Sequence, residues 1–161
     1  MTTQPTEDDI AAIKDLIDRS TLVGIEYHDL AATLSGAQVS EEAEPTIDMQ
    51  LQIEHRCGPD GFGFRLVGEI NAAVGDARAS VAATYRFDGD IPSQRALFGF
   101  GNEVAVMTIF PFFREAVSSI TAKVFGQPIL LPVLNRGDVG YDLEDASTDP
   151  AFTPAADTME S

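Results

Sequence analysis

Four stretches of the chain alternate apolar and polar residues with a period of two, which predicts four β-strands at residues 22–34, 46–57, 62–74 and 79–87. In the second stretch, the most regular, one face carries Ile47, Met49, Leu51, Ile53, His55 and Cys57. Turn sequences follow it at 59–61 (Pro-Asp-Gly) and follow the third at 75–76 (Gly-Asp). Because these connections are short, we predict an antiparallel meander with one dry face and one wet face.

The first strand changes phase along its length. Its apolar residues are first Val23, Ile25 and Tyr27, and then Leu30 and the alternate positions after it. One extra residue in a strand moves every later side chain to the other face. The change of phase therefore predicts a β-bulge in this strand.

Two helices flank the strands. Thr6 followed by three acidic residues is typical of a capped helix start, and the apolar spacing after it predicts a short helix ending near residue 19 or 20. The second predicted helix, 111–126, begins with Pro111 in the first turn and ends at Gly126, and Pro128 prevents its continuation. Its apolar stripe consists of Phe113, Val117, Ile120 and Val124, widened by Phe112 and Ala116.

Composition and charge narrow the class of protein. With 161 residues and 44% hydrophobic content, the chain can form one domain with a substantial core. Ten basic residues against 26 acidic ones give a net charge of −16, which argues against nucleic-acid binding because phosphates are neutralised by cations. The same charge favours basic partners or basic client segments, although solubility alone explains it equally well.

No sequence feature predicts catalysis or a bound cofactor. The single cysteine, Cys57, forms no internal disulfide, and His28 and His55 lack metal-ligand spacing. Neighbouring residues such as His28 and Asp29 point to opposite faces of a strand and cannot act together. The N-terminus is acidic and no long apolar run follows it, so we predict a soluble cytoplasmic protein without membrane insertion.

The chain has more large apolar residues than one helix needs in order to cover the sheet. A helix is about 10–12 Å wide and four strands are about 19 Å wide, so the predicted helix leaves part of the dry face uncovered. An apolar groove between helix and sheet is expected, with aromatic residues at Phe98, Phe100, Phe110, Phe112, Phe113 and Phe125. These residues are alternatively ordinary core. A small-ligand pocket protein or enzyme is the alternative function, although few polar residues face inward.

The order of elements and two motifs resemble the SecB family of export chaperones. Residues 109–115 (IFPFFRE) are similar to the family's aromatic-Pro-aromatic start of the main helix, and residues 127–133 (QPILLPV) to its Pro-containing apolar segment. The resemblance covers about residues 20–136. It implies an α+β protomer with a four-stranded antiparallel sheet packed by a C-terminal amphipathic helix, assembled as a homotetramer, a dimer of dimers.

The resemblance also implies a function. Such chaperones hold unfolded precursor polypeptides in apolar grooves without ATP, and the client-binding positions implied here are Met49, Leu51, Phe98, Phe100, Phe110, Phe112, Phe113, Val117, Ile120 and Val124. Family members hand clients to the SecA motor through acidic residues, and Asp29 occupies one such position. Thr33 and Thr84 stand where acidic residues are expected, and Asn135, Arg136 and Gly137 replace an aromatic residue and a second helix. A SecB-like chaperone that serves a toxin–antitoxin system is a further alternative.

These observations predict a simple organisation. Residues 1–20 form an N-terminal tail and short helix, and residues 21–136 form the SecB-like chaperone domain. Residues 137–161 contain acidic residues and no basic one, with Pro150 and Pro154 among them, which predicts a disordered acidic tail.

Overall fold

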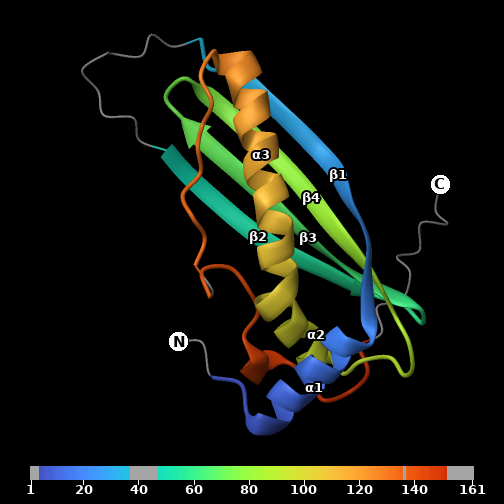
Figure 1. Cartoon of the computed structure of the whole chain (residues 1–161). Coiled ribbons are helices and arrows are strands. Elements are labelled where there is room, and N and C mark those ends of the chain that lie inside the picture. Colours follow the sequence, from blue (N-terminus) through green and yellow to red (C-terminus); the bar gives the residue numbers. More distant parts are fainter. Residues whose placement is uncertain (1–3, 37–46, 136, 152–161) are drawn as a thin grey trace, which may run out of the picture.

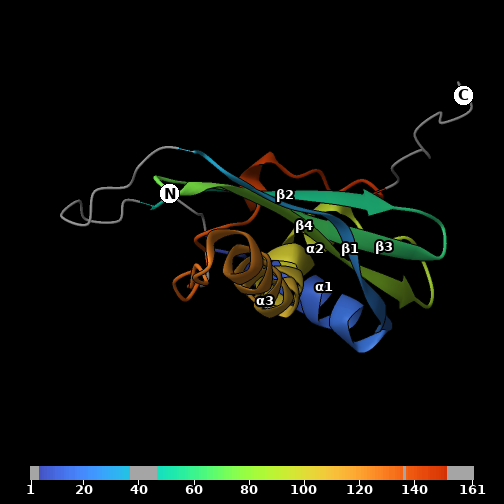
Figure 2. The same ribbon diagram turned by 90° about the horizontal axis from the view of Figure 1, so that it is seen from above.

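The protein is an α+β fold in which one antiparallel sheet is covered by helices on a single face. The computed structural model describes residues 4–36, 47–135 and 137–151. Figure 1 shows the long helix crossing the sheet, and Figure 2 shows the two layers from above. The elements in chain order are α1 (Glu7–Asp18), β1 (Ser20–Leu34), β2 (Ile47–Cys57), β3 (Gly61–Ala72), β4 (Gly75–Phe87), α2 (Gln94–Phe100), η1 (Gly101–Ala105), α3 (Val106–Phe125) and η2 (Leu143–Asp145).

The strand order is β1-β4-β3-β2, and all three pairings are antiparallel. The predicted four-stranded antiparallel sheet is therefore confirmed, but only β2, β3 and β4 form a meander. The first strand pairs with β4 and not with β2, which corrects the simple meander. Hairpin pairing is imposed by loops of about two to five residues, whereas the β1–β2 connection spans 35–46 and leaves β1 free to pair elsewhere.

The turn between β3 and β4 lies two residues earlier than predicted. Ala72 pairs with Gly75, so the turn residues are Ala73 and Val74, and the predicted Gly75-Asp76 turn is wrong. Gly75 is needed for a different reason. A Cβ atom there would collide with the backbone oxygen of Thr33 on β1, so the glycine permits close approach of the neighbouring strand.

The predicted bulge in β1 is confirmed. The register with β4 shifts between Tyr27 and Asp29, and again between residues 22 and 24. Tyr27 pairs with Val81 and Leu30 with Ala79, so both lie on the helix-covered face although three positions separate them. The extra residue is His28, which the change of phase in the sequence had indicated.

The N-terminal helix begins where its cap predicts. Thr6 accepts a hydrogen bond from the Asp9 N–H at 3.1 Å, and the Asp9 carboxylate accepts one from the Thr6 N–H at 2.9 Å. This reciprocal capping box satisfies two N–H groups that the first turn leaves unpaired. The helix ends at Asp18, with Arg19 as its C-cap.

The long helix starts earlier than its proline predicts. Helical backbone runs from Gln94 to Phe125, with a π-helical turn at Gly101–Ala105, so Pro111 lies inside α3. A proline in a helix leaves the carbonyl four residues before it unpaired. Here that residue is Met107, whose side chain is 42% exposed, so water can reach this side of the helix. Gly126 ends α3 with a left-handed φ of 81°, as predicted.

The same helix is the centre of the hydrophobic core. Gln94–Phe125 is long and apolar enough to cross a membrane, but 61% of its most apolar window is buried inside the fold, which is typical of a core helix. Phe113 is fully buried against the sheet, where Gly68 of β3 leaves space for its ring. A Cβ atom at Gly68 would also lie 2.7 Å from Leu51 Cδ2, so this glycine sets how closely helix and sheet approach.

Residues 137–151 pack on the domain, in contrast to the disordered tail that their acidic composition predicted. Leu143 and Ala151 are buried, and Pro150 forms a β-bridge with Ser93. Residues 152–161 of the predicted tail lie outside the described residues. Acidic composition alone missed these contacts because a few apolar residues at intervals are enough to hold a segment on the domain surface.

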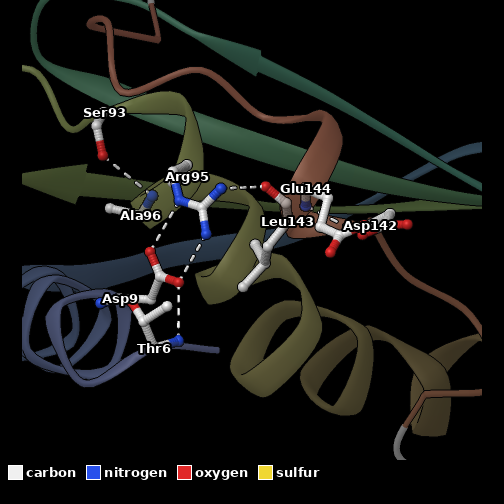
Figure 3. A network of polar contacts seen from close by, with 8 residues as sticks. All are labelled: Thr6, Asp9, Ser93, Arg95, Ala96, Asp142, Leu143 and Glu144. Carbon is white, nitrogen blue, oxygen red and sulfur yellow. Dashed lines mark hydrogen bonds and ion pairs between the residues drawn. The ribbon is translucent and has the colours of Figure 1, made fainter. Parts of the chain in front are cut away.

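Arg95 joins three segments in one polar network (Figure 3). Its guanidinium donates to both carboxylate oxygens of Asp9, at 2.9 and 2.7 Å, and to the Leu143 carbonyl oxygen at 2.5 Å. The hydrogen bond from Arg95 holds the pKa of the buried Asp9 carboxyl well below its usual range, against the opposing effect of burial. The network fixes α1 and the 143–145 turn on α2.

Candidate functional site

The helix-covered face of the sheet is filled by two elements side by side. α3 packs against β4, β1 and β3. After α3 the chain turns back, and residues 127–135, here called the return segment, run beside α3 across the β2 side of the sheet (Figures 1 and 2). The return segment therefore occupies the place where the sequence predicted an open groove between helix and sheet.

The return segment hides some apolar side chains and exposes others. Ile129, Leu131 and Leu134 are buried in the core, whereas Leu130 is 73% and Val133 is 72% exposed. A buried hydrogen bond holds the start of the return segment on α3: the Ile129 N–H donates to Thr121 Oγ1 at 2.8 Å. Two large apolar side chains are thus presented to solvent on a segment whose neighbouring residues are buried.

A second exposed apolar surface lies at the β1 edge. Leu22, Tyr27, Leu30 and Leu34 pair with residues on the helix-covered face of β4, and each is 41–55% exposed. Phe112 of α3, 40% exposed, belongs on the same side. It is nine residues before Thr121, which is half a turn around a helix at 100° per residue, so it points away from the return segment. We call the four β1 residues the edge surface, and Phe112 is not part of it.

The structure divides the predicted client-binding residues into two groups. Phe100, Phe110, Phe113 and Val117 are buried in the protomer core. The remaining residues reach the surface to different degrees: Phe112 is exposed, and the half-buried ones are Met49, Leu51, Phe98, Ile120 and Val124. Helical spacing identified the stripe correctly but could not show that its centre is covered by the sheet.

The half-buried Phe98 belongs to a cluster of aromatic rings that packs residues 137–151, here called the C-terminal segment, against the domain. Its ring stacks on Tyr141 at 4.2 Å between centroids and meets His55 edge-on at 4.8 Å. His55 Nδ1 lies 3.1 Å from the Tyr141 hydroxyl oxygen. Burial lowers the pKa of His55 and raises that of Tyr141. Both groups are therefore neutral near pH 7, and the cluster is a packing contact.

A hollow of about 540 Å³ lies between α1, the π-helical turn and the C-terminal segment. Asn102 is its best-placed polar side chain, but both ends of the amide are already bonded. It donates to the Tyr141 carbonyl at 2.8 Å and accepts from the Tyr141 N–H at 2.6 Å. Within residues 4–36, 47–135 and 137–151, no three His, Cys, Asp or Glu side chains come together as metal ligands.

Asp29, predicted to contact a motor protein, lies on the open face of the sheet, the face turned away from the helices. Its carboxylate forms an ion pair with Arg78 at 2.9 Å, and Arg78 also lies 3.7 Å from Glu69. Thr84 is on the same face, because it is one residue out of phase with the buried residues of β4. Of the positions where the resemblance implies an acidic residue, Asp29 is therefore paired with an arginine and Thr84 is not acidic.

Sequence reasoning missed Leu130 and Val133 as surface residues. Residues 129–131 are all apolar, so the sequence pattern did not show that Leu130 faces solvent between the buried Ile129 and Leu131. The β1 edge likewise carried no signal, since its exposure follows from pairing with β4 alone.

Comparison with known proteins supports a single fold assignment. No protein-family model and no curated protein matches the sequence. Among solved structures, the chain is similar to the Mycobacterium tuberculosis SecB-like chaperone Rv1957, in complex with a ChAD peptide from the HigA1 antitoxin Rv1956. The TM-score is 0.70 at 19% identity, and the match covers 78% of this chain and 98% of that chain. The chain therefore has the SecB-like fold that its helix-start motif predicted.

Proposed function

We propose that the protein is a holdase, an ATP-independent chaperone that binds non-native polypeptides through its exposed apolar side chains. The observation that carries the proposal is the pair Leu130 and Val133, 73% and 72% exposed on the return segment of a SecB-like fold. Large exposed apolar side chains grouped on one surface are typical of partner sites. The similar solved chaperone is bound to a peptide, which supports a polypeptide ligand.

Clients are proposed to contact residues that reach solvent on either side of α3. These are Leu130 and Val133 with half-buried Met49 and Leu51 beside the return segment, and Phe112 on the other flank. The buried residues Phe100, Phe110, Phe113 and Val117 support this surface from below. Half-buried Phe98, Ile120 and Val124 lie at its margins. Many weak apolar contacts of this kind give broad specificity.

We propose that the clients form a narrower set than the precursors handled in general protein export. The similar chaperone is solved with an antitoxin peptide, which favours dedication to a toxin–antitoxin system. Transfer of precursors to SecA is the other candidate, and it is weakened because the Asp29 carboxylate is held by Arg78. We propose that the protein acts in the cytoplasm, needs no cofactor and catalyses no reaction.

The edge surface is proposed to join protomers. An edge strand leaves a row of N–H and C=O groups unpaired, and β1 has apolar side chains along the same edge. A second copy that pairs β1 with β1 would satisfy both features about a twofold axis. This arrangement agrees with the dimer of dimers that the resemblance implies.

The test is suppression of aggregation. A chemically unfolded client is diluted into buffer with stoichiometric amounts of the protein, and light scattering is followed. We expect suppression by the wild-type protein and a several-fold weaker effect for the double variant Leu130→Ser/Val133→Ser. Ile10→Ser, which removes an apolar side chain that is 52% exposed on α1, is the control. Absence of suppression by the wild-type protein would refute the holdase function.

A further inference from the structure

The open face of the sheet carries charges of opposite sign at its two ends. Strand register places Arg56 of β2 in one row with Thr84 of β4, and Arg86 one row nearer the β2–β3 turn. At the other end, Asp48 and Asp76 share a row across the same strands. Residues 48 and 56 are about 27 Å apart at the rise of an antiparallel strand. The face is thus cationic near the β2–β3 turn and anionic at the opposite end.

This cationic end is unusual in a chain with 10 basic and 26 acidic residues. Arg65 and Arg78 on the same face pair with Glu54 and Asp29, respectively. By contrast, Arg56 and Arg86 form no ion pair or side-chain hydrogen bond with any residue of the described ranges. Two exposed arginines on neighbouring rows therefore keep their full hydrogen-bonding capacity despite the excess of carboxylates.

A hollow lies beside Arg56, the first of these two arginines. It has a volume of about 210 Å³ and is bordered by Arg56, Arg65, His28 and the small residues Gly63 and Ala82. The Arg56 side chain lies over Gly63 of β3, where a Cβ atom would be 3.7 Å from Arg56 Nε, an ordinary van der Waals contact. Glu54, which also borders the hollow, is occupied by Arg65, and Glu26 nearby lies 3.3 Å from His28 Nε2. Glu54 and Glu26 thus already have partners.

We propose that this end of the open face docks an extended acidic segment of a partner protein, with carboxylates paired to Arg56 and Arg86. The planar guanidinium presents its donors in a fork that matches a carboxylate. At 0.15 M salt the Debye length is about 8 Å, so the two arginines act locally while distant acidic residues are screened. A nucleic acid would bring a continuous row of phosphates toward Asp48 and Asp76, whereas an acidic segment brings only a few charges.

The site is independent of the proposed client surfaces. The open face is opposite to α3 and the return segment, as Figure 2 shows for the two layers, so a partner bound there leaves the apolar side chains accessible. An acidic partner is also the reverse of what acidic docking residues such as Asp29 would select. The inference therefore goes beyond the holdase function and identifies a second interaction surface with its own charge preference.

The test uses fluorescently labelled peptides in which four Asp residues alternate with Ser, and matched peptides with Asn or Lys in place of Asp. Binding to the full chain is measured by fluorescence anisotropy at 0.15 M salt. We expect the Asp peptide to bind at least tenfold more tightly than the Asn and Lys peptides. The double variant Arg56→Gln/Arg86→Gln should lose this preference, and Lys14→Gln/Lys123→Gln, which removes two exposed cations elsewhere, should keep it.

Three outcomes would overturn the inference. These are equal affinity for the Asp and Asn peptides, an unchanged preference in the arginine double variant, and binding of a single-stranded RNA oligonucleotide in preference to the Asp peptide. Aggregation suppression by the arginine variant is measured in parallel and should equal that of the wild-type protein. Loss of acidic-peptide binding can therefore be distinguished from failure of the holdase function.

Discussion

Thr121 of α3 accepts a hydrogen bond from the backbone N–H of Ile129 at 2.8 Å, across the bend where the chain leaves the helix. The hydroxyl is completely buried and also donates to the Val117 carbonyl at 2.6 Å. The Thr121 hydroxyl therefore accepts from a buried N–H of the return segment, and its own O–H group donates within the helix. The contact holds the start of the segment that carries the exposed Leu130 and Val133.

Replacement of Thr121 by valine should destabilise the protein by about 1–3 kcal/mol, because it leaves the Ile129 N–H buried without an acceptor. Valine keeps the shape, so the loss reports the hydrogen bond. The free energy of unfolding from urea titration measures it. Ser119→Ala, which removes a hydroxyl bonded only to the exposed Glu115 carboxylate, should change stability by less than about 0.5 kcal/mol. Equal effects in the two variants would contradict the assigned role.

The Asp9–Arg95 contact predicts how stability depends on pH. The pKa of Asp9 is lowered in the folded protein, first by the hydrogen bond from Arg95, whereas an unfolded aspartate titrates near 3.9. The contact therefore stabilises the fold above about pH 4, and this contribution is lost as pH falls toward the lowered pKa of the folded state.

We expect Asp9→Asn to reduce stability at pH 7 and the difference from wild type to shrink as pH is lowered from 5 to 2. Urea midpoints over this range provide the measurement. Asp15→Asn is the control, because Asp15 is 69% exposed and its ion pair with Arg19 is screened by solvent. A difference between wild type and Asp9→Asn that stays constant with pH would show that Asp9 contributes by packing alone.

The features that were predictable from sequence depend on local geometry. The bulge around His28 follows from a change in apolar phase, and the capping by Thr6 and the end of α3 at Gly126 follow from residues with distinct backbone preferences. These signals involve residues within a few positions of one another, so no tertiary information is required.

The features that were missed depend on contacts between distant segments. Pro111 is accommodated inside a helix because the preceding residues have apolar partners in the sheet, which favour helix over the local preference for a helix start. Similarly, Phe113 belongs to a stripe that the sequence allows to be either core or client contact. Its burial depends on Gly68, 45 positions away in sequence (113 − 68), which no periodicity reveals.

Gly68→Ala tests this close approach directly. The added methyl group would collide with the Phe113 ring and the Leu51 side chain, so we expect a loss of about 1–3 kcal/mol in stability. Gly24→Ala is a matched control on β1, where no atom lies within 4 Å of the new Cβ. Thermal unfolding followed by circular dichroism should separate the two variants. Equal melting temperatures would show that α3 can shift away from the sheet at little cost.

Phe112 and Phe113 provide a test of which aromatic residues serve clients. Phe113 is fully buried, so Phe113→Ser should destabilise the fold by about 3–5 kcal/mol, as for truncation of a core aromatic residue. Phe112 is 40% exposed, so Phe112→Ser should leave the melting temperature nearly unchanged and weaken aggregation suppression. Full suppression by a folded Phe112→Ser variant would remove Phe112 from the proposed client surface.

The last prediction concerns assembly of protomers through the edge surface. Tyr27 and Leu30 are 50% and 41% exposed beside the unpaired edge of β1. Burying them against a second copy would stabilise the dimer by about 25 cal/mol for each Å² of apolar surface removed from water. Lysine at both positions places charges in that interface, so Tyr27→Lys/Leu30→Lys should lower the mass measured by light scattering. Ile47→Lys, 45% exposed on the opposite edge of the sheet, is the control and should retain the wild-type mass. Dissociation by the β2 control alone would place the protomer interface at the other edge, and a monomeric wild-type protein would leave β1 available to clients instead.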